Sequence, residues 1–207
     1  MNRKKTEPLR TIMNPLQLLV KPTQKHPFPD YFLLKGSFEQ EGYPYLLQFD
    51  GAAEPNPGPS CGAAVLLQSD NGQQWTPVFE VGQFMPFATN NQAEYEGLYQ
   101  GLLRAKLRKV QHLLIEGDSN LIVQQMTGQW KCKNSELLKR LQDCKSLLRN
   151  FHYVAIRHVY RNENTFADKL SKEGVMKGES FLREIPGSRG LVRQAWADPS
   201  EQVVAFD

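Results

Sequence analysis

Four acidic residues stand where predicted strands end or predicted helices begin. Asp50 and Asp118 each follow an apolar run (YLLQF and HLLIEG), whereas Glu94 and Asp168 fall in the first turns of two predicted helices. If the strands pair in the expected order, the four carboxylates converge at one edge of a sheet. Clustered carboxylates repel one another unless cations neutralise them, and oxygen ligands without Cys or His suit Mg²⁺ or Mn²⁺. Two such ions held together are a known device for attack on a phosphodiester.

Each carboxylate also has a purely structural explanation. Asp50-Gly51 is a common turn dipeptide, and Glu94 follows Asn91 by three residues, as in a capping box. Asp118-Ser119 fits a helix N-cap, and Asp168 fits a solvated helix position. We interpret the four as one site because all of them fall at element ends that a mixed sheet brings together.

The elements that position these residues follow the order β-β-β-α-β-α-α-β-α. This order predicts an α/β fold with a five-stranded mixed sheet and helices on both faces. Small residues at i, i+4 spacing, from Ala93 to Ala105, indicate that the first helix lies close to the sheet. The predicted strands are 46–49, 63–67, 75–84, 111–116 and 154–159, and the predicted helices are 91–109, 120–127, 134–151 and 165–173.

The chain of 207 residues divides into three predicted regions: an N-terminal extension (1–43), a catalytic domain (44–175) and a C-terminal tail (176–207). The FPDYFLL segment of the extension is a candidate added strand, and Asp70-Asn71-Gly72 predicts a hairpin turn. Three cysteines without CxxC pairing and the lack of a membrane-length apolar run predict an intracellular protein, cytoplasmic or nuclear. A net charge of +3 is compatible with a nucleic-acid partner without requiring one.

Four stretches resemble the successive motifs of ribonuclease H, type I, in its archaeal and plant-like branch. They are DGAAEPNPGPSCGAAVLL, TNNQAEYEGL, EGDSNLIVQQM and RHVYRNENTFADKLS. The resemblance implies the ribonuclease H-like fold and a metal-dependent endonuclease that hydrolyses the RNA strand of RNA–DNA hybrids. It also implies two Mg²⁺ ions, with Mn²⁺ as a possible substitute. Two alternatives stay open: a catalytically silent nucleic-acid-binding or scaffold module, and the ribonuclease H of a reverse-transcribing element.

The resemblance also implies roles for single residues. Asp50 bridges both metals, Glu94 and Asp118 bind one, and Asp168 binds the metal that carries the attacking water. An assisting role in product release falls to His158 or Arg161, and strand parity places His158 with the buried Val154 and Ile156. We lean towards Arg161 and leave the two open. The implied substrate-binding residues are Gly51, Asn90, Asn91, Gln92, Ser119 and Trp130.

Two departures from the family pattern bear on affinity. The Lys/Arg-rich protrusion of bacterial relatives is missing, and Phe87 stands where some relatives carry an arginine for a DNA phosphate. We therefore expect weak substrate binding with a steep salt dependence.

Overall fold

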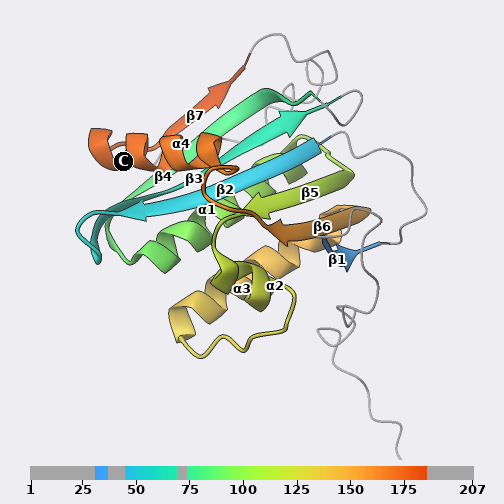
Figure 1. Ribbon diagram of the computed structural model, residues 1–207, viewed down its shortest axis with the longest axis horizontal. Coiled ribbons are helices and arrows are strands. Elements are labelled where there is room, and N and C mark those ends of the chain that lie inside the picture. Colours follow the sequence, from blue (N-terminus) through green and yellow to red (C-terminus); the bar gives the residue numbers. More distant parts are fainter. Residues whose placement is uncertain (1–30, 37–44, 70–73, 186–207) are drawn as a thin grey trace, which may run out of the picture.

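The computed structural model describes residues 31–36, 45–69 and 74–185 (Figure 1). The predicted hairpin turn at 70–72, most of the N-terminal extension and the basic stretch at 188–193 lie outside these ranges. The strands are β1 (Phe32–Lys35), β2 (Tyr45–Ala53), β3 (Gly58–Gln68), β4 (Thr76–Ala88), β5 (His112–Gly117), β6 (Tyr153–His158) and β7 (Phe181–Glu184). The helices are α1 (Asn90–Leu107), α2 (Asn120–Met126), α3 (Ser135–Leu147), a 3₁₀ turn η2 (Leu148–Asn150) and α4 (Thr165–Lys177).

The described strands form one mixed sheet in the order β1-β6-β5-β2-β3-β4-β7. β2, β5 and β6 run parallel at its centre, and the pairings of β3, β4, β7 and β1 are antiparallel. Long β2–β3–β4 hairpins followed by parallel strands with helical crossovers give the mixed α/β architecture that the element order predicts. The α/β fold with helices on both faces is therefore confirmed.

The sheet has seven strands rather than the five predicted, because a short strand is added at each edge. β1 begins within the FPDYFLL segment and pairs with β6, whereas β7 pairs with β4. Each has four residues, too few for a two-residue hydrophobic period to stand out. Both lie outside the range 44–175 assigned to the catalytic domain, and both join its sheet.

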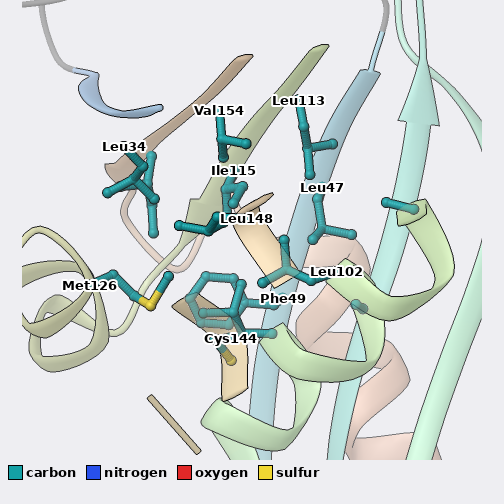
Figure 2. Packing of buried hydrophobic residues seen from close by; sticks show 14 of the residues in the cluster. Leu34, Leu47, Phe49, Leu102, Leu113, Ile115, Met126, Cys144, Leu148 and Val154 are labelled. Carbon is teal, nitrogen blue, oxygen red and sulfur yellow. The ribbon is translucent and has the colours of Figure 1, made fainter. Parts of the chain in front are cut away.

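Alternating side chains of the central strands fill two cores. Leu47 and Phe49 point to the face covered by α1, α2 and α3, where they join the larger cluster with Leu102 (Figure 2). Leu46 lies on the other face, in a smaller cluster with Leu170 of α4. Asp50 has the parity of Leu46, and so its side chain belongs to the α4 face.

α1 packs unusually close to the sheet at its N-terminal end. A Cβ atom added at Gly51 of β2 would lie 2.1 Å from the backbone nitrogen of Glu94, and one at Gly97 would lie 2.6 Å from the Asp50 carbonyl oxygen. Only glycine permits this approach, which sets the first turn of α1 against the strand that carries Asp50. Among the described residues, no helix is both long and apolar enough to cross a bilayer.

Candidate active site

Asp50 lies inside β2 rather than at its tip, which corrects the expectation from the sequence. β2 continues to Ala53 against β3, but its parallel pairing with β5 stops at Phe49 and Gly117. Asp50 therefore stands where the neighbouring strand ends, next to Asp118. Its side chain is 6% exposed and accepts a hydrogen bond of 2.5 Å from the Ser171 hydroxyl.

Asp118 follows β5 and is held by a buried asparagine. Asn164 Nδ2 donates to Asp118 Oδ1 at 2.9 Å and to the Phe49 carbonyl oxygen at 2.8 Å. Ser119 is the N-cap residue of α2 and its side chain makes no capping hydrogen bond. The capping explanation for Asp118-Ser119 is therefore wrong, and the Asp118 carboxylate is available for a role in the site.

Glu94 is likewise not a capping residue, because α1 begins one residue earlier than predicted. Thr89 is the N-cap, and Gln92 completes the capping box with it. Glu94 Oε1 accepts from Asn90 Nδ2 at 3.1 Å, and its Oε2 is buried without a hydrogen bond of normal geometry to the described residues. The Glu94 carboxylate thus carries a buried oxygen that the described residues do not fully satisfy.

Burial dominates the electrostatics of the two inner carboxyl groups. It raises the pKa of Asp50 to about 6, with the charges of Asp118 and Asp168 adding to the rise and the Ser171 hydrogen bond opposing it. Burial also raises the pKa of Glu94 to about 7, a rise that Asp50 and Asp118 increase and Ser119 opposes. An ionised cluster of this kind is unfavourable until a cation enters.

Asp168, at the open side of the site, is already paired. Arg161 Nε and Nη2 lie 2.8 and 2.5 Å from Asp168 Oδ1, and Lys172 Nζ lies 2.6 Å from Oδ2. Partial burial raises the pKa of this carboxyl, but the hydrogen bonds from Lys172 and Arg161 outweigh it and leave the pKa below its ordinary value. The reading of Asp168 as a merely solvated residue is wrong.

Asp50, Glu94 and Asp118 line one hollow, which we call the catalytic pocket. Asp168 is not among its lining residues but pairs with two that are, Arg161 and Lys172. The acidic lining of the pocket comes from β2, α1 and the end of β5, and its cationic lining from Arg161 and Lys172. No three His, Cys, Asp or Glu side chains of the described ranges are grouped tightly enough to hold a metal ion as they stand. The lining residues are Asp50, Gly51, Ala52, Ala53, Glu54, Asn90, Glu94, Asp118, Arg161, Lys172, Val175 and Met176.

The donor set nevertheless fits a hard cation. Four carboxylate side chains line the pocket, those of Asp50, Glu54, Glu94 and Asp118, and the buried Glu94 Oε2 is an oxygen in need of a partner. Asp168 would become a ligand only by exchanging its ion pairs with Arg161 and Lys172, both of which are exposed and able to move.

The predicted substrate-binding residues divide into two groups. Gly51 and Asn90 line the pocket, and the Ser119 hydroxyl lies beside Glu94. Gln92 is occupied by the cap of α1 and a hydrogen bond to Glu136 of α3, whereas Asn91 is exposed. Trp130 is 50% exposed beyond α2 and is not part of the pocket lining.

His158 is exposed, which corrects the expectation from strand parity. It is the last residue of β6, where the sheet ends, so the alternation no longer buries it. Its Nε2 lies 3.1 Å from the Asp118 carbonyl oxygen, while Arg161 contacts Asp168 directly. The structure thus brings both candidates to the site, Arg161 to a carboxylate and His158 to the backbone.

Sequence analysis missed the positioning residues Asn164, Ser171 and Lys172. Asn164 lies within the quoted RHVYRNEN stretch, and its only sequence signal was an asparagine just before the last helix. Its 0% exposure and its bond to Asp118 emerge only when β2, β5 and α4 are assembled. Ser171 and Lys172 lie three and four residues after Asp168, the spacing of one helix face.

The ion pair between Glu116 and Arg157 lies next to the site. Glu116, two residues before Asp118, is 4% exposed and accepts hydrogen bonds from Arg157, the Tyr31 hydroxyl and Gln48 Nε2. Gln48 in turn stands two residues before Asp50, and the Arg157 guanidinium lies 4.8 Å from the centre of the Tyr31 ring. The network therefore ties β1 and β6 to the strands that carry two of the site carboxylates.

Replacing Arg157 by Met is expected to lower the free energy of unfolding by roughly 2–4 kcal/mol, because it leaves the Glu116 carboxylate buried without its cation. The value sits below that of a fully buried pair because the Arg157 side chain is 30% exposed. Urea denaturation measures it, with Arg149→Met at an exposed position as the control, expected to change stability by about 0.5 kcal/mol or less. If adding Glu116→Gln to Arg157→Met restores none of the loss, the buried charge is not its cause.

Comparison with known proteins agrees with this geometry. Together the sheet order and the placement of the carboxylates define a ribonuclease H-like α/β domain. The profile of a family described as reverse transcriptase-like matches residues 48–174, more than half of the chain. The chain belongs to this family, and the resemblance to ribonuclease H that its motifs predict is confirmed.

Individual relatives match at 35–37% identity, and one of them is named a ribonuclease HI. A ribonuclease HI of Halobacterium salinarum is 37% identical over 127 residues, 61% of this chain and 62% of that protein. A bifunctional protein of Mycobacterium tuberculosis is 35% identical over 130 residues, 63% of this chain and 35% of that protein. The chain thus spans less than two thirds of the length of either curated relative.

Solved structures match over most of their length. The RNase H1 of Halobacterium salinarum has a TM-score of 0.60 at 34% identity, covering 64% of this chain and 98% of that one. LC11-RNase H1, solved in complex with an RNA/DNA hybrid, has a TM-score of 0.57 at 28% identity, covering 64% and 97%. The fold assignment therefore rests on nearly complete ribonuclease H domains.

Proposed function

We propose that this protein is a metal-dependent endonuclease that hydrolyses the RNA strand of RNA–DNA hybrids inside the cell. The observation that carries the proposal is the convergence of Asp50, Glu94 and Asp118 at one pocket, where the Glu94 Oε2 is buried without a hydrogen bond of normal geometry to the described residues. Clustered carboxylates that are partly or fully buried without cations are unfavourable, and none of the three caps a helix. The named relatives, one of them solved with a hybrid, support this substrate class.

The proposed ligands are Asp50, Glu94, Asp118 and Asp168, and the proposed cofactor is a pair of Mg²⁺ ions, with Mn²⁺ as a substitute. When bound, such ions activate water and neutralise charge that develops on the phosphate. The protein's own part is to hold the carboxylates in place. Ser171 fixes Asp50 and Asn164 fixes Asp118, so neither carboxylate must reorganise when substrate arrives.

Arg161 is our proposed assisting residue, with a positioning role before catalysis. It neutralises Asp168 while the pocket is empty of substrate, and its exposed guanidinium is placed to contact a phosphate once Asp168 takes another partner. His158 is further from the carboxylates, through its contact with the backbone of Asp118. We therefore assign His158 the smaller role in assisting the reaction.

Recognition of RNA is proposed to come from the backbone around the pocket. Gly51, Ala52 and Ala53 line it with little side-chain bulk, so a strand can approach closely enough for its 2′-hydroxyls to be read. Asn90 lies on the same side, held by its backbone N–H to Asn56 Oδ1 at 3.0 Å.

A hybrid with a central tract of 2′-deoxyribose in its RNA strand tests this reading. We expect cuts to vanish within the tract and to persist at the ribonucleotides that flank it, as seen by gel mapping of an end-labelled strand. The unmodified hybrid of the same sequence is the control. Uniform cutting through the tract would contradict recognition of the RNA strand.

A further inference from the structure

Tyr160 is a large aromatic residue whose side chain is exposed to solvent. It is next in sequence to Arg161, which lines the catalytic pocket. Tyr160 is 75% exposed, in the connection between β6 and α4. The Glu163 N–H donates to the Tyr160 carbonyl oxygen at 2.8 Å, and the Tyr160 N–H donates to Glu163 Oε2 at 3.2 Å. The turn is anchored by Asn164, which is fully buried beneath Asp118. The backbone of Tyr160 is therefore held in a defined turn, although the ring contributes nothing to the core.

The surroundings of this ring connect it to the pocket. The His158 and Tyr160 rings stand edge to face, with their centroids 6.1 Å apart, and His158 contacts the Asp118 backbone. Arg161, the next residue, lines the pocket and pairs with Asp168. Phe166, on the first turn of α4, adds a second ring to the same connection and is 48% exposed. Two exposed aromatic rings, Tyr160 and Phe166, thus lie in sequence on either side of Arg161, which lines the pocket.

We propose that Tyr160 contacts a nucleotide of the bound strand where that strand leaves the catalytic pocket, with His158 steadying the ring. The bases of a hybrid are paired and stacked on one another, so the surface open to an exposed ring is the ribose edge of a nucleotide. Packing there tolerates any sequence because every nucleotide carries a ribose. This contact compensates for the missing basic protrusion by adding affinity that does not depend on phosphate charge. This inference rests on the proposed function and names a further contact for its substrate.

The test compares Tyr160→Ala and Tyr160→Phe in the full chain, using steady-state cleavage of a labelled RNA–DNA hybrid with Mg²⁺. Hybrid affinity is also measured by fluorescence anisotropy in chelator, where no cleavage occurs. We expect Tyr160→Ala to raise KM and the metal-free Kd about tenfold, in the range of one lost packing contact of an aromatic side chain, with kcat changed less than about twofold. Tyr160→Phe keeps the ring and is expected to stay within about twofold of the unchanged protein.

Leu182→Ala is the matched control, because Leu182 is an exposed apolar residue (41%) on β7 at the far edge of the sheet. It should leave KM, kcat and Kd unchanged. Cleavage by the unchanged protein with no rise in KM or Kd in Tyr160→Ala would overturn this inference alone. An equal effect of Tyr160→Phe would also overturn it, since the hydroxyl and not the ring would then matter. If the unchanged protein neither binds nor cuts the hybrid, the proposed function itself fails.

Discussion

Asp50→Asn is expected to abolish cleavage, lowering kcat by a factor on the order of 10³ or more. Asp50 is the carboxylate at the centre of the site: it lies between the pocket, Ser171 and the charges of Asp118 and Asp168. Asparagine has nearly the same shape and still accepts the Ser171 hydrogen bond, so only the charge is lost. Single-turnover cleavage of a labelled hybrid measures the effect.

The same substitution should not damage the fold. Because burial raises the pKa of Asp50 from 3.8 to about 6, the group is more easily ionised unfolded than folded. Its charge therefore opposes folding increasingly as the pH rises from 3.8 to about 6, and the full cost persists at neutral pH. Neutral asparagine removes that cost, so the melting temperature without metal is expected to stay unchanged or rise by roughly 2–4 °C. Asp143→Asn on α3, away from the pocket lining, is the matched control for activity. Retained cleavage by a folded Asp50→Asn protein would remove Asp50 from the reaction.

Gly51→Ala is expected to have the second large effect, on stability and activity together. The added Cβ would lie 2.1 Å from the Glu94 nitrogen and 2.4 Å from the Ala93 carbonyl carbon, both backbone atoms that cannot rotate away. The first turn of α1 must therefore move, and Glu94 moves with it relative to Asp50. We expect a loss of about 3 kcal/mol in unfolding free energy, as for overpacked cores, and a fall in kcat of about 100-fold.

Gly101→Ala separates these effects. On the same helix, its Cβ would meet the side chains of Ala64 and Leu47 at 2.8 Å, away from the pocket. Repacking of the Leu47 side chain absorbs part of this contact, so we expect some loss of stability and unchanged kcat in the folded protein. If Gly51→Ala retains full kcat while destabilised to the same degree as Gly101→Ala, the close approach of α1 does not position Glu94.

The sequence predicted which helices and strands are present better than it predicted the residues at which they begin and end. Long amphipathic or apolar segments such as α1 and β5 were found because their periods persist over many residues. β7 escaped because four residues carry too little pattern, whereas β1 was expected as a candidate added strand within FPDYFLL. β2 was ended early because Asp50 breaks its apolar run. Whether β2 continues depends on its partner β3, which the local sequence does not reveal.

The residues of the site likewise divide into those that the sequence identified and those that it did not. Asp50 and Asp118 were identifiable because each follows an apolar run, where a carboxylate is unusual. Glu94 and Asp168 were identifiable mainly because the family motifs contain them. Asn164 and Ser171 were not, because a neutral residue that orients a carboxylate has no signature until two distant segments meet, 121 positions apart for Ser171 and Asp50. The burial of His158 was wrongly predicted because parity holds only as far as the sheet extends.

The measurement that tests the central claim most directly is cleavage of an RNA–DNA hybrid with both strands labelled, beside RNA–RNA and DNA–DNA duplexes of the same sequence. Each is incubated with Mg²⁺ and, separately, with chelator. We predict cutting of the RNA strand of the hybrid alone, lost in chelator. Binding of the hybrid by the folded protein without any cutting in Mg²⁺ or Mn²⁺ would contradict the account and favour a silent binding module.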